Sequence, residues 1–169
     1  MLPQLKGLAI LDSDARNMQS TTEGNLSITY WKRYEAENYF VTPEVLRSYT
    51  LERYQNLDLF GELIRADVDE VLDALVLKII FLNHIADFNI WKNNPDASRL
   101  VWESKTESLK LSQFAEEFFR KISEKAGGPM LLKKGELHQL IPFVDIKNIS
   151  HEVSEKLDSL NTLFKQIPV

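Results

Sequence analysis

The chain contains no cysteine, which excludes disulfide bridges, cysteine-ligated zinc sites and thiol catalysis. It also has no long apolar run: the most apolar stretch, residues 71–82, spans about 12 residues and includes two charged side chains, whereas a membrane-spanning helix needs about 20. Residues 7–11 are too short for the apolar core of a signal peptide and are followed directly by Asp12. We therefore expect a cytoplasmic protein that does not contact a membrane.

Several familiar catalytic motifs are absent as well. The phosphate-loop pattern GxxxxGK[ST] does not occur, and neither GxGxxG nor GxSxG is found. The three histidines, His84, His138 and His151, stand alone with no spacing that suits a metal site, so we expect each to have a structural role. The acidic and basic side chains are therefore the remaining candidates for chemistry.

The composition that remains is typical of a soluble globular protein. The chain has 169 residues, of which 44% are hydrophobic and 27% charged. It carries 20 basic and 25 acidic side chains, for a formal net charge of −5. This acidic balance argues against a protein that coats nucleic acid non-specifically, but it allows binding through a local patch or a metal.

Two strands are expected near the N-terminus. Residues 5–11 form a short apolar run that ends at Asp12, which is typical of a buried strand. Residues 26–31 alternate apolar and polar side chains of β-branched and aromatic types, which indicates a second strand. The polar residues 15–25 are interpreted as a loop, and the charged segment 32–40 fits neither a helix nor a strand.

The rest of the chain carries helical patterns. Thr42-Pro43-Glu44 combines an oxygen cap, a first-turn proline and an acid, and it predicts a helix that runs to about Tyr54. Apolar side chains recur at helical spacing in three later segments, which predicts helices over 68–91, 111–126 and 150–165.

Two intervening segments are less regular. Residues 55–66 are expected to form a loop or a short helical turn. Residues 130–145 are expected to begin as a short strand or extended loop and to end in a short helix over 135–143. Together these elements predict an α/β protein with one domain, 1–169, in which a small sheet precedes a mostly helical C-terminal half. Two strands are few, because a stable sheet generally needs three or more.

The first candidate site is Asp12-Ser13-Asp14, directly after the first strand. Residues i and i+2 of an extended segment project to the same side, so Asp12 and Asp14 can share one hard cation such as Mg²⁺. Ligands of open α/β sheets sit beyond the carboxyl ends of the strands, which favours this position. The alternative is a solvated turn with capping aspartates.

The second candidate is the charged segment after the second strand. Adjacent strands can bring their ends together, so Glu37, or Glu35 in its place, would join Asp12 and Asp14 around a metal. Arg33 would then contact a phosphate. The alternative is a charged surface corner with aromatic side chains packed beneath it.

The third candidate is a basic cluster that includes Lys133 and Lys134. A lysine held by the turn at Gly135 can neutralise a phosphate in a transition state. The neighbouring basic residues 120–125 have a simpler explanation, because basic side chains suit the C-terminal end of a helix dipole.

The order of these pieces resembles a known family. A strand ending in Asp-x-Asp, a second strand, and then Arg33-x-x-x-Glu37-Asn-Tyr-Phe before the Thr-Pro-Glu-Val-Leu helix resemble the second half of a TOPRIM domain. The similarity is to the type that follows the ATPase in OLD-family (overcoming lysogenization defect) nucleases and related AAA-type ATPases. Lys134-Gly-Glu-Leu-His-Gln-Leu and the helix that begins at Ser150 are similar to the close of those chains.

The resemblance implies a metal-dependent nuclease. Asp12 and Asp14 would be the metal pair, Glu37 a further ligand or a residue that holds one, and Lys134 the lysine that acts on the phosphate. One or two Mg²⁺ or Mn²⁺ ions would activate water and stabilise the pentacoordinate phosphate of a DNA backbone cut. The implied partners are DNA and an ATPase domain of the same or another chain, with a homodimer as a further possibility.

The sequence departs from this family in two places. A TOPRIM domain opens with an apolar strand that ends in a glutamate, and no such strand precedes Asp12 here; the ATPase domain is also absent. The chain would then be an incomplete fragment, or a subunit completed by another chain. Two alternatives stay open: a non-catalytic interaction or dimerisation module that uses the helices and a free sheet edge, and a phosphatase with Asp12 as nucleophile.

Overall fold

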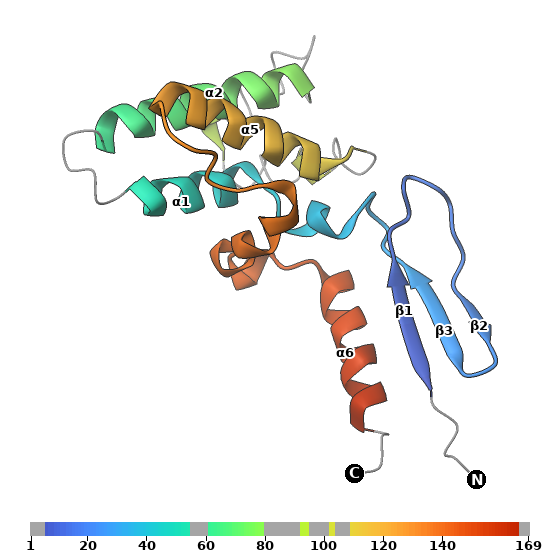
Figure 1. Ribbon diagram of the computed structural model, residues 1–169. Helices are drawn as coiled ribbons and strands as arrows, with labels where there is room; N and C mark the ends of the chain where they lie inside the picture. Colours follow the sequence, from blue (N-terminus) through green and yellow to red (C-terminus); the bar gives the residue numbers. More distant parts are fainter. Residues whose placement is uncertain (1–5, 55–60, 80–91, 95–101, 104–108, 166–169) are drawn as a thin grey trace.

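The computed structural model describes residues 6–54, 61–79, 92–94, 102–103 and 109–165. It is an α/β structure in which a small N-terminal sheet is followed by a mostly helical C-terminal half (Figure 1). The fold class predicted from the sequence is therefore confirmed. In the described part of the chain, no helix is long and apolar enough to cross a membrane.

The sheet has three strands in the order β1-β3-β2. β1 (Gly7–Leu11) and β3 (Leu26–Tyr30) are the two strands expected from the sequence, and they pair in parallel from Gly7↔Leu26 to Leu11↔Tyr30. Because the pair is parallel, both strands end at the same edge of the sheet. The Asp12–Asp14 loop and the segment after β3 therefore leave the sheet side by side.

The short strand β2 (Thr21–Glu23) was not expected, because residues 15–25 were interpreted as a loop. β2 pairs antiparallel with β3 in a hairpin in which Glu23 lies opposite Leu26. The two turn residues are Gly24, at φ 59°, and Asn25. Gly-Asn between β-branched and apolar residues is a hairpin signal, and it explains why a polar segment becomes a strand.

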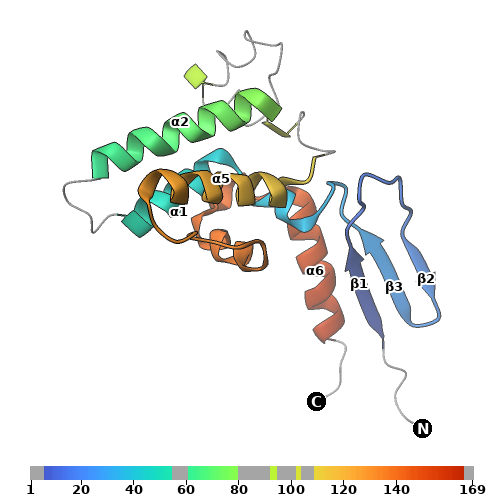
Figure 2. The same cartoon turned by 45° about the horizontal axis from the view of Figure 1, so that its top comes forward.

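The two faces of the sheet differ. Paired residues share a face, so the register places Ala9, Leu11, Leu26, Ile28 and Tyr30 on one face and Leu8, Ile10, Ser27 and Thr29 on the other. Helix α6 (His151–Lys165) lies beside β1, and its Lys156 Nζ donates to Thr29 Oγ1 on the second face at 3.1 Å. α6 runs alongside β1 in both views (Figures 1 and 2).

The opposite edge of β1 has no strand partner in the described part of the chain, where β1 pairs with β3 alone. On the first face, Leu11 and Leu26 remain 45% and 41% exposed. Parallel strands usually have both faces covered by other elements. The first face of this sheet departs from that pattern.

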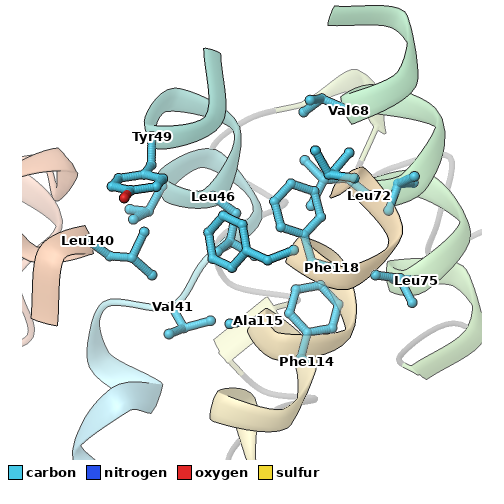
Figure 3. Close-up of a cluster of buried hydrophobic side chains, with 14 of the residues drawn as sticks. Val41, Leu46, Tyr49, Val68, Leu72, Leu75, Phe114, Ala115, Phe118 and Leu140 are labelled. Carbon is cyan, nitrogen blue, oxygen red and sulfur yellow. The ribbon is translucent and has the colours of Figure 1, made fainter. Parts of the chain in front are cut away.

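The hydrophobic core lies in the helical half, between α1 (Pro43–Tyr54), α2 (Gly61–Ile79), α5 (Leu111–Ala126) and the 3₁₀ helix η2 (Lys134–Phe143). Figure 3 shows Leu46, Leu72, Phe118 and Leu140 converging from these four elements. The strands contribute no residue to this core, so the small sheet packs at its side.

The helix ends follow the local signals in the sequence. α1 begins as expected, with Val45 N–H donating to Thr42 Oγ1 at 3.3 Å. α5 ends at Gly127, whose φ of 65° is left-handed and suits a residue without a side chain. The expected short helix over 135–143 is present as η2, and the front of that region is irregular and not a strand.

α2 begins at Gly61, earlier than its apolar pattern predicted. Residues 61–66 were assigned to a loop or short turn, but they form the first turns of α2, with Ile64 buried at 9% exposure. Ile64 extends the apolar stripe of Val68, Val71 and Leu75 by one more step of four residues, which explains the longer helix. The continuation predicted over 80–91 lies outside the described residues.

Two further 3₁₀ helices join the two halves. η1 (Ala36–Tyr39) lies between β3 and α1, and η3 (Ile146–Asn148) lies between η2 and α6. η1 falls in the charged segment 32–40, which fitted no regular element in the sequence. This short polar turn lies between the sheet and the helices, and it carries Ala36 and Glu37 of the candidate site.

Candidate metal site

The Asp12–Asp14 loop and the segment after β3 are joined by three hydrogen bonds. Ser13 Oγ donates to the Arg33 carbonyl at 2.8 Å, and Asp14 N–H donates to the Tyr34 carbonyl at 3.0 Å. Ala36 N–H donates to Asp12 Oδ1 at 3.0 Å. Ser13 is 4% exposed, so its hydroxyl is a buried anchor and not a nucleophile facing solvent.

Asp12 and Asp14 are both exposed, on either side of the buried serine. Asp14 has a left-handed φ of 49°, and Ala15 follows at 57°. Aspartate is among the few residues that tolerate this region, whereas it strains alanine. Asp14 Oδ2 pairs with Arg16 at 2.9 Å. The loop is thus held in one conformation that presents two carboxylates to solvent.

The expectation that Asp12 and Asp14 project to the same side assumed an extended segment, whereas Asp14 lies in a turn at a left-handed φ of 49°. The backbone alone therefore does not align the two carboxylates for a shared cation. Mg²⁺ commonly takes one or two protein carboxylates and fills its remaining positions with water or phosphate oxygens. Within the described ranges, however, no group of three or more acidic, histidine or cysteine side chains is close enough to hold a metal. Asp12 and Asp14 would therefore be the protein ligands of a largely hydrated ion.

Glu37 and Glu35 have different environments. Glu37 is half-buried in η1, and its backbone carbonyl accepts from Val41 N–H at 2.8 Å. Glu35 is 4% exposed, and its Oε1 accepts from Ser112 N–H at 2.7 Å while its Oε2 lies 3.8 Å from Lys110 Nζ. Glu35 thus caps α5 from a distance and has no free carboxylate for a metal.

Asn38 completes this cap. Its Oδ1 accepts from Leu111 N–H at 3.1 Å, and its Nδ2 donates to the Leu109 carbonyl at 2.7 Å. The N-cap position of α5 is Lys110, which has no acceptor for the first N–H groups of the helix. The sequence does hold one signal for this contact. Because Lys110 cannot cap α5, the acceptors for the first N–H groups of α5 must come from another part of the chain.

The Arg33 side chain already contacts three other residues. Its side chain is 16% exposed, donates to the Asn38 carbonyl at 2.5 Å, and lies 3.4 Å from Glu103 Oε1. Its guanidinium also sits 4.7 Å from the centre of the Tyr39 ring. Arg33 therefore borders the candidate site as a structural residue, and it would have to leave these partners to contact a phosphate.

Lys134 lies elsewhere in the fold. It is the first residue of η2, which packs against α1 and α5, and its side chain is exposed. The contacts in the described residues do not bring Lys134 to the Asp12–Asp14 loop. The basic residues considered with it have nearer partners, since Arg120 pairs with Glu124 and Lys125 with Asp67 and Glu70.

A buried polar contact that the sequence did not indicate ties this region to α6. Tyr39 donates its phenol proton to Glu152 Oε2, and Lys32 N–H donates to Glu152 Oε1 at 2.9 Å. Lys156 Nζ lies 3.7 Å from the same carboxylate. Burial, and then the hydrogen bond to Glu152, raise the pKa of Tyr39 above its usual value.

The remaining histidines stay apart from this site. His138 is exposed, and His151 is exposed beside Glu155, with Nδ1 3.4 Å from Oε1. His84 lies outside the described residues.

In comparisons with known proteins, no family model, curated protein or solved structure matches this chain.

Proposed function

We propose that this chain is the metal-binding portion of a TOPRIM-type nuclease that hydrolyses DNA phosphodiester bonds with Mg²⁺ or Mn²⁺. One observation carries the proposal: two exposed carboxylates, Asp12 and Asp14, follow a parallel strand and are held there by a buried serine. Carboxylates held in place before the ion arrives lose little conformational freedom on binding it, which favours binding. The resemblance supplies the reaction class.

When bound, the metal would supply an activated water and stabilise charge on the phosphate. The chain contributes the ligands and their positioning: Asp12 is oriented by Ala36 N–H, and Asp14 by its backbone bond to the Tyr34 carbonyl. Arg16 pairs with Asp14 and would move aside or bridge to a phosphate when the ion binds. Glu37 remains the candidate for a further ligand, and Lys134 for a phosphate contact.

The edge of β1 that has no strand partner, beside which α6 runs, bears on how such a site would be completed. The family resemblance implies a further apolar strand that ends in a glutamate. A strand that paired in parallel with this unpaired edge of β1 would end at the same edge of the sheet as Leu11, next to Asp12. Without such a strand we expect weak activity or none, and a second chain that supplied it would raise the activity.

A non-catalytic interaction module is the second candidate. It is favoured by the same unpaired edge of β1 and by the exposed Leu11 and Leu26 on one face of the sheet. In that case the chain would form a tight dimer, or bind a partner, without any response to metal. Light scattering with and without Mn²⁺ separates the two functions.

The test is a titration with Mn²⁺ and Mg²⁺ followed by thermal unfolding. A ligand present at about 100 times its dissociation constant adds about 2.7 kcal/mol to stability. We expect this shift in the parent chain and its loss in the Asp12→Asn, Asp14→Asn double variant. The matched control is Glu116→Gln, Asp158→Asn, which neutralises two exposed carboxylates elsewhere. Equal shifts in all three proteins would contradict the metal assignment.

A further inference from the structure

A cavity of about 410 Å³ lies directly beside the Asp12–Asp14 loop. Ser13 and Ala15, the neighbours of Asp14 on either side, form part of its wall, and Tyr30, Trp31 and Lys32 at the end of β3 form another part. The cavity is therefore built by the same two segments that hold the candidate metal ligands.

The charged side chains of this cavity are all basic. Arg16 and Lys32 line it, and no acidic residue does, but Arg16 is paired with Asp14 at 2.9 Å, so Lys32 carries the uncompensated charge. Lys32 is exposed, and its ammonium has no ion pair within the described residues. A local positive wall in an acidic protein suits an anionic group such as a phosphate.

The cavity also offers an apolar and aromatic wall. Trp31 already packs on Tyr39, with ring centres 4.9 Å apart, and lies under the Lys156 ammonium at 5.2 Å. Tyr30 is half-buried and has no ring partner in the described part of the chain, and Met18, which also lines the cavity, is 41% exposed. Of the residues that line the cavity, Tyr30 is the aromatic one whose ring has no described partner and would be the surface for a flat heteroaromatic ring.

From this combination we infer that the cavity binds one nucleotide of a single-stranded nucleic acid, with its phosphate at Lys32 and Arg16 and its base against Tyr30. A base has both faces covered inside a duplex, so only an unstacked nucleotide can use an aromatic wall. The inference rests on the proposed function for its meaning, since it would place the strand next to Asp12 and Asp14.

The experiment measures binding without metal, so that it does not depend on the metal site. A fluorescently labelled oligothymidylate of about ten nucleotides is titrated with the protein in EDTA, and its anisotropy is recorded at several salt concentrations. We expect saturable binding that weakens as salt rises. Lys32→Ala should weaken binding and reduce the slope of log K against log salt by about 0.7, the contribution of one phosphate contact on a single strand.

Tyr30→Leu tests the aromatic wall and keeps an apolar side chain at the half-buried position. Loss of a stacking ring should weaken binding by about 5-fold to 100-fold. The matched control is Lys133→Ala, which removes an exposed lysine in the helical half and should bind as the parent does. A thermal melt of each variant establishes that it is folded.

Three outcomes would overturn the inference: no binding by the parent, parent-like binding by both cavity variants, or equal affinity for a duplex of the same sequence. Asp12→Asn, Asp14→Asn provides the separation from the proposed function, because it should bind the oligonucleotide at least as tightly as the parent. Oligonucleotide binding without a metal-dependent stability shift would contradict the nuclease proposal and support the nucleotide site. A metal-dependent stability shift without oligonucleotide binding would contradict the nucleotide site alone.

Discussion

Glu35→Ala should destabilise the protein strongly, although Glu35 looks like a surface residue in the sequence. Its carboxylate is 4% exposed and accepts from Ser112 N–H at 2.7 Å, with Lys110 Nζ 3.8 Å away. Truncation would leave the Ser112 N–H buried without an acceptor, because the helix start has no oxygen cap of its own. A hydrogen bond to a charged group contributes about 1.5–3 kcal/mol, and an anion at a helix N-terminus adds about 0.3–1 kcal/mol.

We therefore expect Glu35→Ala to lower the free energy of unfolding by about 2–4 kcal/mol. At about 2–4 °C per kcal/mol for a chain of this size, the melting temperature should fall by roughly 4–16 °C. Urea and thermal unfolding followed by circular dichroism measure both quantities. Faster hydrogen exchange at the Ser112 amide would locate the effect at the start of α5.

Two variants make this prediction refutable. Glu35→Gln keeps an acceptor oxygen and loses the charge, so it should recover part of the loss, and its metal-dependent shift should equal that of the parent. Glu37→Ala removes a carboxylate whose side chain is half-buried two residues away, and we expect it to change stability by less than about 0.5 kcal/mol. The capping argument is wrong if Glu35→Ala unfolds like the parent, or if Glu37→Ala costs as much.

Three further predictions concern the contacts around the candidate site. Tyr39→Phe should cost about 1.5–3 kcal/mol in urea unfolding, because it removes the donor to the buried Glu152 carboxylate; parent-like stability would contradict this. The pKa of Tyr39 is raised in the folded state, so its contribution is full below pH of about 10 and falls at higher pH. The parent should then lose stability above that pH more steeply than Tyr39→Phe, and parallel alkaline curves would refute the assignment. Asp14→Asn should leave the fold intact, because asparagine tolerates the left-handed φ of 49°, whereas Asp14→Val should cost about 1–2 kcal/mol in thermal unfolding. Equal melting temperatures for the two variants would remove the argument from backbone conformation.

Several elements could be predicted because their signals are local. The start of α1 at Thr42-Pro43-Glu44 and the end of α5 at Gly127 depend on caps and backbone conformations within one helical turn. The position of Asp12 after a buried strand follows from an apolar run that stops at a charge. The two local errors were β2, missed despite its Gly-Asn turn, and the first turn of α2, missed despite the spacing from Ile64 to Val68.

The sequence by itself thus determined the α/β class, the two strands β1 and β3 and the place of the aspartates directly after β1, because hydrophobic periodicity and helix caps depend on near neighbours. That β1 and β3 pair in parallel was decided by the tertiary structure. The sequence could not distinguish Glu35 from Glu37, which are chemically identical and two positions apart. Only the tertiary structure decided that Glu35 is buried against Ser112, 77 positions away, and that Tyr39 meets Glu152, 113 positions away. The physical reason is that burial and capping across such distances depend on how the helices pack against the sheet, which no local pattern records.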